Sequence, residues 1–284
     1  HKAIYLTTPF WVARLFIGLG LLTFVAFRYL RISLRPDLGV ASKQLNGKHP
    51  AWWNKYTKGW TNEAEEVEKS AAKQRQVAPV VCILFACVLT VSIVDLVMSL
   101  SPHWYSNMFG GWYFASCFWL AMIWVGIYSV LNRGWMGTEK LFKPVVYHDL
   151  GKLVFGFCVV WAYMFYAQLL PIWYGNMTEE IGFLIVRLRL DPWQDLAVVV
   201  AMMCFVIPFV TLLSRGIKKM PMVLTAVFMI PAVGIWLERY IVAAPSTLLD
   251  VTAIPIGILE LGVTAGFVGG FLWVVTNFLS QVPV

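Results

Sequence analysis

The residues of this chain with the most chemical potential are ionisable side chains within or beside long apolar runs. Such side chains are rare at membrane depth, and by default they mark ion or proton pathways or paired sites. One group lies toward the outer ends of the runs and in the outer connections. The charge asymmetry described below indicates which ends these are. Because carboxylates and histidine relay protons through water, this group predicts an exit route for protons. Its members are Asp95, His103, Glu179, Glu180, Glu238, Arg239 and Glu260.

Structural ion pairing is the alternative explanation for part of this group. Glu238 and Arg239 are adjacent, so we expect them not to face one another and each to pair with a neighbouring helix. Arg14 would then pair with Asp95 or Glu260. Asp95 has no basic residue in its own apolar run, which favours a functional role for it.

A second ionisable group, Tyr147, His148, Asp149 and Lys152, lies at the opposite ends of the runs and starts a predicted helix. The acidic residue suits the N-terminal dipole of that helix, and the spacing of His148 and Lys152 puts them on one face. Two interpretations stay open: an interfacial cap with a snorkelling lysine, or an entry point for protons or a contact with a quinone headgroup.

This sequence contains few residues that could bind a metal ion or a haem. The five cysteines all fall inside apolar runs without a C-x-x-C pair, which is typical of buried small hydrophobic residues. A membrane b-haem usually takes two facing histidines, but His103 and His148 are expected near opposite membrane faces. We therefore expect this chain to bind no metal and no redox cofactor of its own.

Composition predicts the kind of fold that positions these residues. Of 284 residues, 60% are hydrophobic and 13% charged, with a mean hydropathy of +0.72, whereas an ordinary soluble domain is about 25% charged. Seven runs are long enough to cross a bilayer as helices, which predicts an all-α membrane bundle of at least seven spans. The runs are 9–31, 79–100, 109–131, 148–172, 193–213, 220–243 and 255–279.

The basic residues indicate the orientation of these spans. Ten Lys or Arg lie between residues 28 and 75, four at 133–152 and three at 215–219, whereas the alternate connections hold only Arg187 and Arg189. Seventeen against two is the pattern of positive-inside topology, and it explains the net charge of +7 better than nucleic-acid binding does. We therefore expect 32–78 to be cytoplasmic and 101–108 to be periplasmic.

This topology predicts three segments: a first span (1–31), a polar loop (32–78) and a six-span region (79–284). Within the loop, TNEAEEVEKSAAKQRQ predicts a short helix on the membrane surface, capped by Thr61 or Asn62. SLSPHWYSNMFGGWYF (99–114) predicts a tight hairpin between two spans. Its rings, Trp104, Tyr105, Trp112 and Tyr113, are expected in the interfacial aromatic belt. Because the chain starts at His1 with no signal peptide, we expect a further N-terminal portion to precede it.

Two longer stretches carry a family resemblance: SLSPHWYSNMFGGWYFASCF and HDLGKLVFGFCVVWAYMFYAQLLPIWYGNMTEE. They resemble the NrfD/PsrC-like (polysulfide-reductase-type) membrane subunits, and most closely the second such subunit of alternative complex III, a quinol-oxidising complex. WYGNMTEE at 173–180 is the best single marker. The resemblance implies a bacterial inner-membrane subunit built from four-helix bundles and without its own cofactor. It also implies an iron–sulfur subunit, multihaem c-type cytochrome subunits and a homologous NrfD-like subunit as partners.

The chain departs from this family's pattern at Pro102-His103-Trp104-Tyr105, where the paired first subunit would carry an Asp and a His around the Trp. The resemblance then implies a scaffold that supports quinol oxidation and moves protons. Two other functions stay open. Pro208, Pro221, Pro231 and Pro255 interrupt or start spans, as in a stand-alone transporter or channel, and a purely structural anchor for extrinsic redox subunits fits equally.

Overall fold

A computed structural model describes residues 5, 7–45, 49–140, 142–248 and 253–282, and every regular element in these ranges is helical. Seven helical stretches are long and apolar enough to cross a membrane. The predicted all-α, multi-pass membrane fold is therefore confirmed. The stretches are Thr8–Gln44, Glu63–Leu100, Phe109–Asn132, Pro144–Gly175, Trp193–Leu213, Pro221–Thr247 and Ile258–Leu279.

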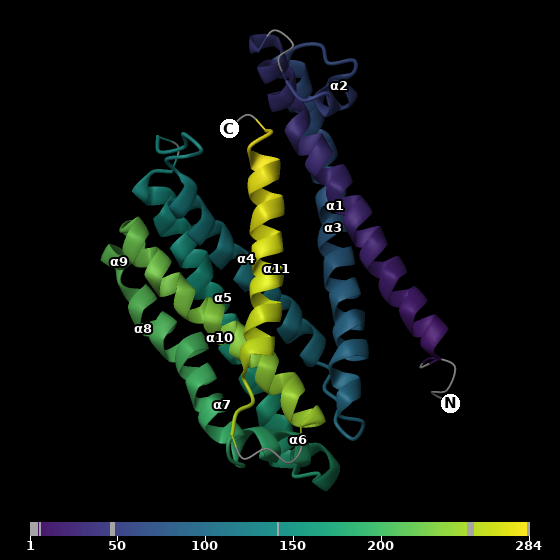
Figure 1. Cartoon of the computed structure of the whole chain (residues 1–284), viewed down its shortest axis with the longest axis vertical. Coiled ribbons are helices and arrows are strands. Elements are labelled where there is room, and N and C mark those ends of the chain that lie inside the picture. The colour runs from purple at the N-terminus through teal and green to yellow at the C-terminus, as the bar shows by residue number, and fades with distance from the viewer. Residues whose placement is uncertain (1–4, 6, 46–48, 141, 249–252, 283–284) are drawn as a thin grey trace. The chain divides into compact units, whose positions relative to one another are not determined.

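Figure 1 shows the helices, and several of them extend beyond the apolar runs that predicted them. Their bounds are α1 (Thr8–Gln44), α2 (Trp52–Thr57), α3 (Glu63–Leu96), η1 (Met98–Leu100), α4 (Phe109–Asn132), α5 (Pro144–Gly175), α6 (Thr178–Leu188), α7 (Trp193–Ala201), η2 (Met202–Val206), α8 (Ile207–Leu213), α9 (Arg215–Lys219), α10 (Pro221–Thr247) and α11 (Ile258–Leu279).

The chain divides into two compact units. Unit 1 comprises residues 1–88 and 256–284, and unit 2 comprises residues 89–255. The predicted division at residue 78 falls inside α3, because that helix continues without a break from its polar start into its apolar end.

In unit 1, the polar segment between the first two spans is more helical than predicted. α1 runs through Pro36 to Gln44, and TNEAEEVEKSAAKQRQ leads directly into α3 instead of forming a separate surface helix. The predicted cap is confirmed, since Asn62 Oδ1 accepts a hydrogen bond from the Glu65 amide at 2.9 Å. Three glutamates in the first turn suit the positive end of the helix dipole.

Polar contacts hold the elements of unit 1 together where the apolar core is small. Arg35 of α1 donates to both carboxylate oxygens of Glu66 on α3, at 2.7 and 3.1 Å. Trp53 of α2 packs with Leu38 and Ala41 of α1. The indoles of Trp52 and Trp53 donate to Gln281, both at 3.0 Å, and so attach the C-terminal end of α11 to α2.

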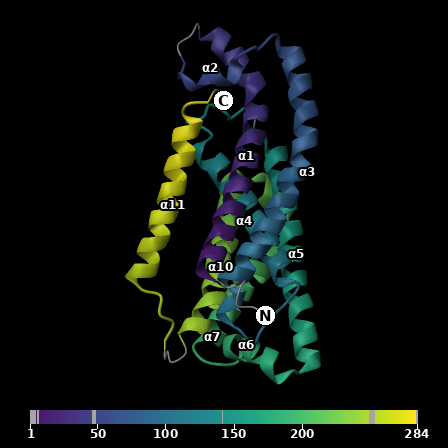
Figure 2. The same ribbon diagram turned by 90° about the vertical axis from the view of Figure 1, so that its right-hand side faces the viewer.

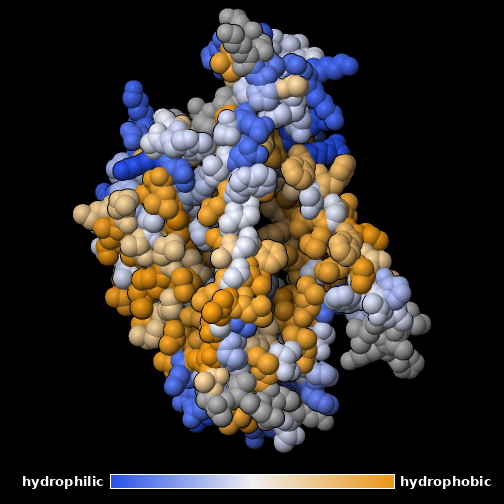
Figure 3. Space-filling model, in the orientation of Figure 1, coloured by the Kyte–Doolittle hydropathy of each residue, from blue (hydrophilic) through white to orange (hydrophobic). Residues whose placement is uncertain are grey.

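Unit 2 has a continuous buried core. α4, α5, α7–α8 and α10 pack against one another (Figure 1), and α4, α5 and α10 also lie together in the turned view of Figure 2. Trp119, Val154 and Phe228 are completely buried among them. Gly126 lets α10 approach α4, because a Cβ at that position would lie 2.5 Å from the Phe228 ring. On the face shown in Figure 3, apolar side chains cover the middle of this unit's helices and hydrophilic ones gather near their ends, as a bilayer requires.

The fifth span contains a π-helical segment, Met202–Val206, between α7 and α8. Pro208 follows it, and a proline has no N–H to offer the carbonyl one turn earlier, which is that of Cys204. The Cys158 thiol of α5 donates to this oxygen at 3.4 Å. A side chain from a neighbouring helix thus satisfies the backbone where the span is irregular.

The 173–192 connection contains a helix that was not predicted. α5 ends at Gly175, Asn176 adopts a left-handed conformation (φ 44°), and α6 begins two residues later. Asn is one of the few residues that tolerate this conformation, so the W-Y-G-N motif is a helix stop followed by a sharp turn. α6 is short and amphipathic, which explains why a search for long apolar runs misses it.

Candidate functional site

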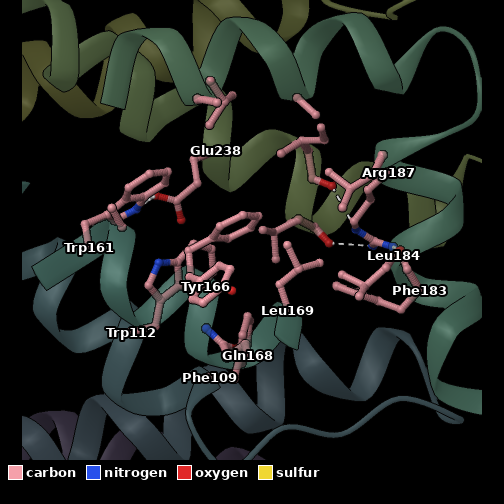
Figure 4. A pocket seen from close by; sticks show the side chains of 18 of the residues that line it. Phe109, Trp112, Trp161, Tyr166, Gln168, Leu169, Phe183, Leu184, Arg187 and Glu238 are labelled. Carbon is pink, nitrogen blue, oxygen red and sulfur yellow. Dashed lines mark hydrogen bonds between the residues drawn. The ribbon is translucent and has the colours of Figure 1, made fainter. Parts of the chain in front are cut away.

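A chamber of about 420 Å³ lies inside unit 2 and is walled by aromatic rings (Figure 4). α4, α5, α6, α7, η2 and α10 all contribute side chains, as does the loop before α4. The volume is within the range of small-molecule sites, which are mostly apolar with a few polar groups. Its aromatic lining comprises Trp104, Phe109, Trp112, Trp161, Phe165, Tyr166, Phe183 and Phe205.

Two stacked ring pairs form flat walls of the chamber. Trp104 lies parallel to Phe183, with centroids 3.8 Å apart and planes 5° apart. Trp161 lies parallel to Phe165 one turn later on α5, with planes 4° apart. Flat aromatic walls favour a flat ligand ring, which gains offset-stacking contacts on them.

Two indole donors in the chamber wall lack an acceptor. The Nε1 atoms of Trp104 and Trp112 are buried and have no hydrogen-bond partner among the described residues. Buried indole N–H groups usually find an acceptor, and leaving one unpaired costs roughly 1–3 kcal/mol.

Glu238 supplies a carboxylate to the same chamber. It is only 2% exposed, and its Oε2 accepts a hydrogen bond from the Trp161 indole at 3.0 Å (Figure 4). Its Oε1 accepts from Arg239 Nη1 at 2.6 Å. The expectation that these neighbours do not face one another is therefore wrong: their Cα–Cβ bonds diverge, but the long guanidinium arm bends back to the carboxylate.

Arg239 extends this ion pair away from the chamber and toward α4. Its guanidinium lies 3.4 Å from the centroid of the Tyr113 ring and donates a short hydrogen bond to the Ser116 hydroxyl. A charge buried in an apolar bundle is tolerated when it is paired and hydrogen-bonded. α10 and α4 therefore share one neutralised polar cluster next to the chamber.

Arg187 of α6 lines another part of the chamber. It donates to the backbone oxygens of Ile241 (3.1 Å) and Val242 (2.8 Å) and to the Ser246 hydroxyl (2.6 Å), all on α10. Pro245 has no N–H for the Ile241 carbonyl, so Arg187 replaces the missing helical donor. Burial lowers the pKa of Arg187 to about 9.

An open groove of about 900 Å³ lies beside the chamber. Four residues line both spaces: Tyr166, Leu169, Leu184 and Leu188. The groove then runs past Trp173 of α5 and Arg189 at the end of α6. A ligand with a ring in the chamber and a long apolar tail in the groove would fit the two spaces together.

The hairpin 99–114 contributes to this site through its rings. Trp104 and Trp112 are 5% and 4% exposed, so they belong to the interior and not to the predicted interfacial belt. Tyr105 is well exposed, as a belt residue should be, and its interaction with Glu180 of α6 raises the Tyr105 pKa. His103 is exposed and lies in the non-helical turn that joins the two helices of the hairpin.

The other residues of the predicted proton path lie at separate places. Asp95 is buried at the penultimate position of α3, and the side chain of Glu179 lies outside the described residues. Glu260 belongs to unit 1, where it caps α11 by accepting from the Gly257 amide at 2.8 Å. Of the predicted set, Glu238 is the residue that lines the chamber, and a continuous relay stays a prediction.

The second predicted group sits near the start of α5, but one turn inside the helix, which begins at Pro144. Asp149 pairs with Lys152 at 2.7 Å and lies 3.6 Å from His148 Nδ1. Asp149 and Lys152 are more than half exposed, which fits the interfacial interpretation. No group of His, Cys, Asp or Glu in the described part of the chain has the arrangement of a metal site.

Comparison with known proteins adds no family to this description. The chain matches no protein-family model, and no curated protein is significantly similar to it. What is established is therefore a multi-pass helical membrane protein with an aromatic chamber beside Glu238 and Arg187.

Proposed function

We propose that this chain is a cofactor-free membrane subunit of a quinol-oxidising electron-transfer complex of the alternative complex III type, and that its chamber binds the ring of a quinone or quinol. The observation that carries the proposal is an aromatic chamber, lined by two tryptophans whose indole donors are unpartnered (Trp104 and Trp112), beside an apolar groove. A quinone has a flat ring, two acceptor oxygens and a long apolar tail, so it complements all three features.

Polar and aromatic residues in and beside the chamber each have a part in this proposal. The indoles of Trp104 and Trp112 donate to the ring oxygens, and the stacked pairs hold the ring flat. Glu238 is the group that takes up or returns a proton at the ring, because carboxylates at membrane depth serve as proton relays. Arg187 and Arg239 keep their own partners and hold α6, α10 and α4 in place around the ligand.

The proposal assigns electron transfer to other subunits. Oxidation of a quinol to a quinone releases two electrons and two protons, and this chain offers no redox centre of its own in the proposal. An iron–sulfur subunit accepts the electrons, multihaem c-type cytochromes pass them on, and a homologous NrfD-like subunit stands beside this chain. The complex lies in a bacterial inner membrane, with 32–78 on the cytoplasmic side and 101–108 on the periplasmic side.

A transporter or channel is the main alternative, and the irregular fifth span is the feature that would favour it. There, however, the Cys204 carbonyl is bound by the Cys158 thiol instead of facing a cavity. The third candidate, a structural anchor, does not require a chamber with unpaired donors. These observations favour quinone binding.

The binding experiment uses the full chain in lipid nanodiscs with a short-tailed ubiquinone or menaquinone analogue. Ring binding next to Trp104, Trp112 and Trp161 should quench tryptophan fluorescence saturably. Ala162→Phe fills the chamber and should weaken binding at least tenfold, whereas Ala121→Phe, on an exposed position of α4, should leave it unchanged. Equal affinity in the two variants would contradict the proposal.

The complex is tested separately by purifying the tagged chain from its native membrane. Stoichiometric iron–sulfur and multihaem c-type partners, with quinol:acceptor activity, are expected. A chain that purifies alone and drives solute uptake in liposomes would be a transporter, and one that brings redox partners but fails to bind quinone would be an anchor.

A further inference from the structure

A second cavity lies in unit 1, where residues of α1, α2 and the C-terminal end of α11 surround a groove of about 440 Å³. Here the apolar runs give way to polar sequence, at about residues 31 and 279. We propose that this groove binds one anionic phospholipid, with its phosphate on Arg31 and its acyl chains on Phe27 and Trp273. This proposal does not depend on the proposed function of unit 2.

The apolar part of the groove suits acyl chains. Phe27 is 64% and Trp273 is 70% exposed, and both lie within the hydrophobic parts of their helices. Trp52 and Tyr56 of α2 close the groove toward the polar end, with ring centroids 5.4 Å apart. Tryptophan and tyrosine rings at this position mark the headgroup level of a bilayer, so the groove crosses the boundary between chains and headgroup.

The polar part of the groove offers donors to a phosphate. Arg31 lies over the Tyr56 ring (4.9 Å to the centroid) and has no carboxylate partner in the described part of the chain. Arg31 is the basic residue among those that line the groove, whereas Arg35, one turn later and outside the lining, is paired with Glu66. Asn277 accepts from Gln281 at 3.4 Å and retains its own NH₂ to donate.

The charge of the surroundings favours an acidic headgroup over a zwitterionic one. Residues 28–75 contain ten Lys or Arg against five Asp or Glu, so this segment carries a net charge of +5. Arg28, Lys55 and Lys58 are exposed, and hydrophilic side chains gather around α2 in Figure 3. Basic pockets between membrane helices at headgroup level are the usual sites for acidic lipids.

The test is native mass spectrometry of the purified full chain, titrated with phosphatidylglycerol or with phosphatidylcholine of the same acyl chains. We expect one phosphatidylglycerol to bind at least fivefold more tightly than phosphatidylcholine. Arg31→Gln should weaken phosphatidylglycerol about tenfold and leave phosphatidylcholine unchanged. The matched control is Arg28→Gln, which removes the same charge from the same helix outside the groove and should change affinity less than twofold.

Equal losses in the two variants, or no preference between the lipids, would overturn the proposal in favour of diffuse surface attraction. Should Arg31→Gln fail to fold, Trp273→Ala provides a second test, because it should weaken both lipids to the same extent by removing acyl-chain contacts. Millimolar glycerol 3-phosphate should not displace the bound lipid. Displacement by this soluble headgroup would mean that the site binds phosphate alone.

Discussion

The two units of this chain differ in how much of their apolar helix surface is buried against other helices. In unit 2, 44% of the apolar window of α4 and of α10 is buried, whereas none of the corresponding window of α1 or α11 in unit 1 is. Among the described residues, a glutamate pairs with an arginine in each unit, within one helix in unit 2 and between two helices in unit 1. Glu238–Arg239 lies deep in the bundle, and Arg35–Glu66 lies at the polar end of α1 and α3.

This difference indicates what each unit needs from its surroundings. Unit 2 packs its helices on one another and neutralises its charges internally, so its site is built from its own residues. The long helices of unit 1 present their apolar faces outward and are joined mainly at their polar ends. We expect those faces to be covered by lipid, consistent with the lipid groove proposed for this unit.

The largest expected effect on stability comes from breaking each of the two ion pairs by substituting its glutamate. Glu238→Gln keeps the Trp161 bond but leaves Arg239 buried without a counter-charge, which should cost about 3–5 kcal/mol of unfolding free energy. Glu66→Gln should cost about 1 kcal/mol, because Arg35 is 29% exposed and can be solvated. SDS unfolding followed by circular dichroism measures both. Similar losses would remove the distinction between the units, and Glu238→Gln combined with Arg239→Gln should recover part of the larger loss.

A second large effect is expected at the α6–α10 contact. Arg187→Leu removes the donor from two buried backbone oxygens, and unfolding free energy should fall by about 3 kcal/mol. Arg187→Lys should recover part of this, because it restores a charge but not the two-pronged geometry. The same unfolding assay applies. An unchanged stability in Arg187→Leu would mean that other groups satisfy the Ile241 and Val242 carbonyls.

Two glycine substitutions compare packing in the units directly. A Cβ at Gly234 of α10 would lie 2.8 Å from Cys204 Sγ and 2.9 Å from Met203 Cβ, so Gly234→Ala should cost about 2 kcal/mol by overpacking. Gly266 of α11 has nothing within 4 Å, so Gly266→Ala should not destabilise the chain. A loss at Gly266 matching that at Gly234 would show that α11 is closely packed in the membrane.

The smallest effect is expected at the exposed Tyr105–Glu180 contact. Glu180 raises the Tyr105 pKa, so the folded chain holds the phenol proton more tightly than the unfolded chain does. The contribution is complete below pH 10 and is lost as pH rises through the raised pKa. Tyr105→Phe should therefore lower the melting temperature slightly at pH 8, and this difference should shrink as the pH rises above 10. A difference that grows with pH would contradict this sign.

The membrane fold could be predicted from the sequence because hydrophobic length is a local signal. All seven spans and the Asn62 cap follow from runs of neighbouring residues. The start of α3 was misplaced since the polar run before it has no helix breaker, so the helix continues from Glu63 into the span. α6 was missed because it is too short to be recognised by length.

The site was harder to predict because its residues come from distant parts of the chain. Trp104 and Phe183 stack across 79 positions, and neither belongs to a local pattern. Arg187 appeared only as one of two charges in an outer connection, although a buried carbonyl before Pro245 gives it a specific partner. The available signal was the proline itself: a proline inside a span implies a donor elsewhere.

The two carbonyls that lose their helical donor to Pro208 and Pro245 also have a consequence for synthesis. A helix that contains a proline enters the membrane with one backbone carbonyl that has no hydrogen-bond donor. Its exposure to lipid is unfavourable in free energy until a donor from another helix reaches it. Cys158 precedes Pro208 in the chain, and Arg187 precedes Pro245. Each donor has therefore left the ribosome before its acceptor helix is complete, so translation from the N-terminus delivers the two groups of each pair in the order that their helices can use.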